Sequence, residues 1–370
     1  LIFLMIILLR VLMKSFPFLL FKKISASVLL MGLCLLAGGT AAANEVHGKY
    51  VPGGAQPASS FPFLQGANLT QADGAWQFYQ QNMGQAMSDW ARTEINQQPG
   101  GTVFYPFSGP DFVTAAHLFP QASRFVLVAM QAAGEPAPIT DMSSARAQNF
   151  QSKFLREWMK FSRLAFFRTD DLNEDLRDKY AQIGVTTILI TFALYMGYDV
   201  TDVYPITLDP KNGQFIQTTE DWRSVRLMLS KAGKPVVLDY VSLDLSDSHL
   251  SQTEAMRAWL ERESRNPVLL KAASHLLQET YFSILRDMLV TNAKMVIQDE
   301  TGLNYTYLSQ IGPVDLYGGF LYPHELFNRK KQESLAQAYK DSKNIRPLPF
   351  AFSYNKTSER RSVQIVRRPE

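Results

Sequence analysis

Residues 102–131, TVFYPFSGPDFVTAAHLFPQASRFVLVAMQ, contain the pattern that decides the fold. The run 102–107 is β-branched and aromatic and predicts a strand, which ends in a sharp turn at 108–109. Pro110 suits the first position of a short helix, because it has no N–H to leave unpaired there. A second apolar run, 125–130, predicts a second strand. Two strands joined through a helix imply a parallel pair with a right-handed crossover.

Hydrophobic periodicity outside this unit predicts more helices and strands around the same sheet. A capping box at 251–254 starts one helix, which is expected to end near 263. Other helices are expected over 73–97, 144–167, 266–292 and 324–340. Strands are expected over 185–196, 224–230, 235–245, 294–298, 303–308, 314–321 and 347–354. The first of these, VTTILITFALYM, is uncharged and predicts a strand buried on both faces.

These elements predict an α/β fold with a mixed, largely buried sheet flanked by helices. A single large domain over 73–354 is expected, and a division near 200–250 is the alternative. Residues 44–72 are rich in Gly, Pro, Ala and Ser and predict an extended lead-in. Residues 355–370 predict a mobile tail.

Residues 1–43 have the composition of a secretory signal peptide. The apolar stretch 1–12 precedes Met13, which is the expected true start. A basic region, an apolar run of 16 residues and an Ala-x-Ala site follow, and cleavage is expected after Ala43. The apolar run is shorter than the roughly 20 residues of a membrane span. A periplasmic or extracellular protein without a transmembrane span is therefore expected, with a retained N-terminal membrane anchor as the alternative.

The charge and the cysteine content exclude several classes of function. The chain has 37 Lys and Arg against 34 Asp and Glu, and removal of 1–43 leaves 33 against 34. A net charge of −1 gives no support for a nucleic-acid partner. Cys34 is the single cysteine and lies in the removed segment, so the mature chain has no Cys-based metal site. No nucleotide-binding fingerprint occurs, nor do the HExxH and GxSxG motifs, and the sequence identifies no cofactor and no metal.

The segment 105–111, YPFSGPD, is the first candidate site, because open α/β sheets bind ligands at the carboxyl ends of their strands. One interpretation makes Ser108 a catalytic nucleophile on a tight strand–turn–helix corner. A second uses the free N–H groups at the helix N-terminus to bind an anion. Tyr105 and Gly109 are the expected ligand-binding residues of this segment. The third is structural, with Ser108 as N-cap and Asp111 as a first-turn carboxylate.

The segment 298–305, QDETGLNY, is the second candidate site and is expected on a turn between strands. Asp299 or Glu300 could act with Asp111 as an acid–base pair, or the two carboxylates could bind a hard cation. Asn304 and Tyr305 would then contact the ligand. The structural alternative is a solvated turn in which the aspartate bonds its own backbone.

Histidines and aromatic residues near these turns give weaker signals. His117 is expected on the short helix after the first turn, close enough to support catalysis. His275 and Glu279 are four residues apart in a predicted helix and would share a face, as a metal pair or as a base with its orienting group. Aromatic residues beside both turns suit ring stacking on a ligand, but the edge of a core is the favoured interpretation.

Three segments, 105–111, 274–308 and 347–354, resemble an uncharacterised family of bacterial secreted proteins. Its members pair a YPFSGPD strand–turn with a later D-[DE]-[ST]-G-[IL]-x-Y turn, which this chain matches at 299–305. The resemblance covers about 100–354 and implies no activity.

The sequence therefore predicts a ligand-binding, hydrolase-like protein that acts on a small molecule or glycan of the cell envelope or the extracellular space. Its catalytic candidates are Ser108, Asp111, Asp299, Glu300, His117 and His275. A non-catalytic binding or envelope-associated structural protein is the alternative. A cavity shared by the two turns, with at least one histidine within hydrogen-bond reach of about 3 Å, would favour the enzyme. Turns at opposite ends of the sheet would exclude this version of it.

Overall fold

The centre of the sheet is the predicted β-α-β unit. β1 (Thr102–Pro106) pairs in parallel with β2 (Arg124–Ala129), and α5 (Phe112–Leu118) makes the crossover. Successive side chains of a strand point to opposite faces of the sheet. Tyr105 accordingly packs into the hydrophobic cluster on one face, and Phe104 into the cluster on the other.

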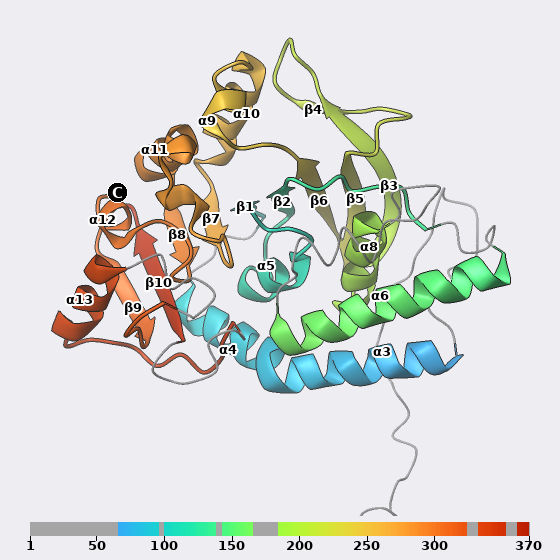
Figure 1. Cartoon of the computed structure of the whole chain (residues 1–370), viewed down its shortest axis with the longest axis horizontal. Coiled ribbons are helices and arrows are strands. Elements are labelled where there is room, and N and C mark those ends of the chain that lie inside the picture. Colours follow the sequence, from blue (N-terminus) through green and yellow to red (C-terminus); the bar gives the residue numbers. More distant parts are fainter. Residues whose placement is uncertain are drawn as a thin grey trace, which may run out of the picture. The chain divides into compact units, whose positions relative to one another are not determined.

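The computed structural model of the protein describes residues 66–95, 100–137, 143–165, 184–323, 332–352 and 361–369. In this part, ten strands form one mixed sheet in the order β4-β3-β5-β6-β2-β1-β7-β8-β10-β9 (Figure 1). The remaining strands are β3 (Asp199–Leu208), β4 (Phe215–Gln217), β5 (Ser224–Lys231), β6 (Lys234–Ser242), β7 (Pro267–Leu270), β8 (Met295–Gln298), β9 (Val314–Gly318) and β10 (Ser362–Arg367). The five central strands run parallel, and antiparallel strands extend the sheet at both ends. The predicted fold class is confirmed, including a single domain.

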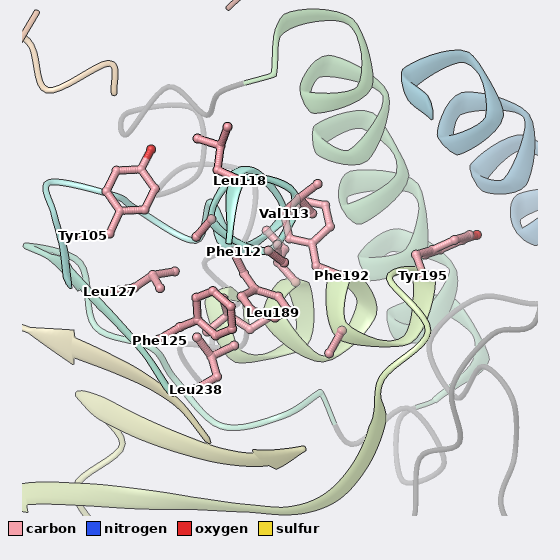
Figure 2. Packing of buried hydrophobic residues seen from close by; sticks show 14 of the residues in the cluster. Tyr105, Phe112, Val113, Leu118, Phe125, Leu127, Leu189, Phe192, Tyr195 and Leu238 are labelled. Atoms are coloured by element: carbon pink, nitrogen blue, oxygen red, sulfur yellow. The ribbon is translucent and has the colours of Figure 1, made fainter. Parts of the chain in front are cut away.

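Helices cover both faces of the sheet. One face carries α3 (Gly66–Tyr79), a π-helical turn (Gln80–Gly84), α4 (Gln85–Glu94), α5, α6 (Ser144–Leu164) and α8 (Val185–Tyr195). The other carries α9 (Asp247–Leu250), α10 (Glu254–Glu263), α11 (Ser283–Asn292) and α12 (Tyr305–Leu308), while α13 (Glu333–Asp341) packs beside β9. Figure 2 shows Phe112 and Val113 of α5 gathered with Phe125 of β2 and with Leu189 and Phe192 of α8. None of the helices in the described ranges has both the length and the apolar character that a membrane span requires.

The prediction of a buried strand over 185–196 is wrong, because this segment is α8. Every side chain of α8 is buried, so its sequence has neither a helical nor an alternating polar face. A run that is apolar on all sides fits a covered strand and a covered helix equally well. Packing decides for the helix: the Phe192 ring lies 4.6 Å from that of Phe161 and 5.0 Å from that of Trp158 on α6.

The predicted helix over 266–292 is wrong in its first half. Pro267–Leu270 is β7, which lies between β1 and β8, and only Ser283–Asn292 is helical as predicted. His275 and Glu279 flank a single 3₁₀ turn (Leu276–Gln278) instead of sharing a helix face. A second 3₁₀ turn (Thr280–Phe282) leads into α11.

Near the C-terminus, two predicted strands and the mobile tail are also wrong. Residues 303–308 contain α12, and 347–352 form no strand. The tail contains β10, which is buried between β8 and β9 and pairs with both. At the other end, α3 occupies residues 66–72 of the predicted lead-in. The predicted signal peptide, residues 44–65 and the first part of the helix expected over 324–340 lie outside the described residues.

Candidate functional site

The two candidate turns lie at the same edge of the sheet. β1, β7 and β8 are parallel neighbours, so their carboxyl ends, which lead to 107–111, 271–275 and 299–302, meet at one edge. The strand order also reverses here: α5 leads from β1 to β2 over one face, and α11 leads from β7 to β8 over the other. Such a switch point is where open α/β sheets place their ligands.

A buried ion pair joins the ends of β1 and β7. Lys271 Nζ lies 2.6 Å from Asp111 Oδ2, and the two side chains are 0% and 4% exposed. The ammonium also donates to Thr114 Oγ1, at 2.9 Å, and to the carbonyl oxygen of Ala165, which uses all three of its protons. Asp111 Oδ1 accepts from Thr114 N at 3.2 Å, so Asp111, and not Ser108, is the N-cap of α5.

The turn after β8 is tied to the loop after β7. Asp299 Oδ2 accepts from Ala272 N at 2.9 Å, and Asp299 Oδ1 accepts from the amide and the hydroxyl of Thr301. The expected Asx bond to the backbone is present. The turn is not solvated, however, because Asp299 and Glu300 are each 1% exposed.

Tyr105 hydrogen-bonds to the first acidic turn and lies within the electrostatic influence of the second. Its hydroxyl donates to Asp111 Oδ2 at 3.0 Å. Burial raises the pKa of Tyr105 well above its ordinary value, and the charges of Asp111 and Asp299 raise it further. Both carboxylates therefore act on one phenol. We call the residues Tyr105, Asp111, Thr114, Lys271 and Asp299 the carboxyl-edge cluster.

Left-handed backbone is concentrated around the carboxyl-edge cluster. Six non-glycine residues in the described part of the chain have positive φ. Five of them lie in the three loops at this edge of the sheet or at Ala165, whose carbonyl oxygen accepts from Lys271. The five are Phe107, Ala165, Ala272, Ser274 and His275. A non-glycine residue in the left-handed conformation costs of order 1–3 kcal/mol, and such residues tend to occur at functional sites.

Ser108 and Gly109 lie on the same edge, but Ser108 is not set up as a nucleophile. Its hydroxyl donates to the carbonyl oxygens of Gly109 at 2.8 Å and Val128 at 3.3 Å. An activated serine would donate to a base instead. The carboxylate of Asp111 already caps α5, which also removes support for an anion at this helix. Gly109 has φ +54° and open space where a Cβ would stand, so the backbone here is accessible from outside.

His117 lies apart from the carboxyl-edge cluster, contrary to its predicted supporting role. It points from α5 toward α4 and the π-helical turn before it. Its Nδ1 is 2.7 Å from Ser88 Oγ of α4, and its Nε2 is 3.3 Å from Gln80 Nε2 of the π-helical turn. Burial, together with the charge of Lys231, lowers the pKa of His117 to about 3. It therefore serves as a neutral bridge between helices.

His275, Asn304 and Tyr305 lie next to the second turn. The backbone N–H of His275 donates to Thr301 O at 2.9 Å, and its Nδ1 is 3.2 Å from Gln332 Nε2, which also donates to Glu300 O. Asn304 caps α12 through Thr306 N, and Tyr305 packs against the small cluster under α13. The structure thus brings His275 and Glu300 together, and it turns Asn304 and Tyr305 toward α13.

Lys271 is the principal residue of the cluster that sequence reasoning missed. A lone lysine follows the apolar run PVLL of β7, but the sequence pattern predicts a helix over that run. Across the described ranges, no group of three or more His, Cys, Asp or Glu side chains has the geometry to hold a metal ion. Comparisons with protein-family models, with curated proteins and with solved structures find no match to this chain. Function is therefore inferred from the geometry of the site.

Proposed function

We propose that the protein is a secreted or periplasmic enzyme of the hydrolase type, which binds a small polar molecule or glycan over the carboxyl-edge cluster. The observation that supports this is the convergence of buried charges and left-handed backbone at the switch point of the sheet. Stability alone does not favour such an arrangement, because a buried ion pair seldom stabilises more than apolar packing would.

The contacts suggest a division of roles. Asp111 and Lys271 neutralise each other and hold the loops after β1 and β7 together, so we assign them a positioning role. Asp299 is the proposed general acid or base, because its carboxylate lies at the carboxyl edge of the sheet, where it accepts from two backbone amides and a hydroxyl. Ser108 and the exposed Ser274 are the proposed polar contacts to the ligand.

The proposal is tested by thermal unfolding of the protein with sugars, acyl esters, nucleotides and divalent metals, with and without chelator. A ligand at 100 times its Kd adds about 2.7 kcal/mol of stability. Asp299→Asn should abolish the shift. Asp111→Asn should also abolish it, and Asp239→Asn is its matched control, because Asp239 is equally buried and pairs with Arg124 and Arg226.

A shift that is lost in Asp299→Asn and Asp111→Asn, but kept in Asp239→Asn, supports the site. Hydrolysis of the stabilising compound by the wild type then distinguishes an enzyme from a binding protein. The site is contradicted if the shift persists in the Asp299 and Asp111 variants. A protein that melts cooperatively and responds to no compound favours the structural alternative.

A further inference from the structure

A hollow of about 410 Å³ lies where α13 meets the segment that follows β9. Figure 1 shows α13 beside β9, at the end of the sheet opposite to β4. The volume is within the 300–1,000 Å³ range of small-molecule sites. Its apolar lining comes from 319–321, from Ala336 and Tyr339 of α13, and from Ile345. Lys340 is the one charged residue among the described residues that line it.

The floor of this hollow is apolar and firmly packed. Phe320 and Tyr339 are 3% and 5% exposed, and their ring centroids are 6.3 Å apart. The hydroxyl of Tyr339 donates to Tyr317 O at 2.8 Å. Because this phenol oxygen is already bonded to the backbone of β9, Tyr339 contributes its ring to the hollow.

The rim leaves large apolar side chains in water. Leu321 is 61% exposed and Ile345 is 39% exposed. Apolar side chains gathered around a concave surface indicate binding of an apolar body, whereas single exposed ones need no explanation. The occupant should therefore cover both rim residues as well as the rings below them.

Lys340 determines the charge of the occupant. It is exposed in the last turn of α13, and the neighbouring carboxylate of Asp341 accepts from Gln337 Nε2 at 2.8 Å. The carbonyl groups at a helix C-terminus repel an anion, so among the described lining residues the ammonium of Lys340 is the group that can hold one. An apolar hollow with an ammonium at its rim matches an amphipathic anion.

We propose that this hollow binds one free fatty acid, with the acyl chain over Phe320 and Tyr339 and the carboxylate at Lys340. The inference uses none of the residues of the carboxyl-edge cluster and does not rest on the proposed hydrolase activity. It can therefore fail or hold independently of that activity.

Calorimetric titration of the full protein with decanoate, decanol and decyltrimethylammonium tests the proposal, because the three probes share a chain and differ in charge. Decanoate should bind most tightly. Lys340→Gln should weaken decanoate by about fivefold, as for an exposed ion pair, and leave decanol unchanged. Lys343→Gln is the control, since this nearby exposed lysine does not line the hollow. Ala336→Trp should fill the hollow and remove binding of all three probes.

Four results would overturn the proposal. In the first, decanoate still binds to the Ala336→Trp variant, and in the second, decyltrimethylammonium binds as tightly as decanoate. In the third, the protein binds anionic vesicles but not free decanoate. In the fourth, the protein forms a dimer that buries the hollow and excludes decanoate. The exposed Lys340→Gln variant keeps the test decisive if the tryptophan variant folds poorly. The near-ultraviolet circular dichroism of the Lys340→Gln variant should match that of the wild type.

Discussion

Replacement of Lys271 by methionine tests whether the buried ion pair holds the carboxyl-edge cluster together. Methionine keeps the unbranched shape of the side chain and removes its charge and its donors. The change leaves Asp111 buried at 4% exposure without its cation, and it removes the donor to Thr114 Oγ1 and Ala165 O. Breaking a buried pair from one side costs about 3–5 kcal/mol. We expect a loss of that size in the free energy of unfolding.

The double variant Lys271→Met/Asp111→Asn shows how much of the lost stability comes from the unpaired charge of Asp111. Asparagine keeps an acceptor for Thr114 N and places an amide N–H donor beside the hydroxyl oxygen of Tyr105, and it removes the uncompensated charge. The double variant should therefore lose less stability than the two single losses added together, by about 1–3 kcal/mol. The exposed pair Arg265–Glu261, at 2.9 Å with side chains 60% and 53% exposed, is the control, and its disruption should cost about 1 kcal/mol or less.

Urea unfolding, followed by circular dichroism and tryptophan fluorescence, measures these differences, and an unchanged m-value shows that the unfolded reference is the same. The reasoning is refuted if Lys271→Met costs no more than the control pair. It is also refuted if the two single losses are additive, because the charges would then not interact.

Three further changes have defined outcomes. Gly318→Ala should cost about 1–3 kcal/mol, because its Cβ would collide with the carbonyl oxygen of Arg361. Gly233→Ala is the control: it has a similar φ and open space around the Cβ position, so it should cost less in the same urea experiment. Ala272→Gly should stabilise the fold by up to about 1 kcal/mol by relieving its left-handed strain, and a loss of stability would contradict this. Because the pKa of His117 is lowered to about 3, the unfolded chain binds a proton between pH 3 and 6.5 that the folded chain does not. Stability should therefore fall as the pH drops through this window, by up to about 1.4 kcal/mol per pH unit, and His117→Gln should flatten that slope in acid unfolding.

The central β-α-β unit was predictable because its signals are local. Residues 102–129 combine two β-branched runs with a turn and a short helix, and their separation fits only a parallel crossover. The acidic turns were predictable for the same reason. Both follow a strand, so the residues that decide their place are adjacent in the sequence.

The errors arose where burial is uniform or where partners are distant. α8 is covered on all sides, so its sequence has no polar face from which to read a period. β7 and β10 are stabilised by neighbouring strands that are remote in sequence, and in β10 basic residues beside the alternating pattern obscured it.

The sequence by itself determined the parallel core of the fold and the residue types at two polar turns. Only the tertiary structure decided that Lys271 lies between them, that His117 points to α4, and that Asp111 and Asp299 act on the same tyrosine. The physical reason is the separation along the chain over which each interaction acts. Turn and strand propensities act between residues close in the chain, whereas the ion pair joins residues 160 positions apart and exists only once β1 and β7 have paired.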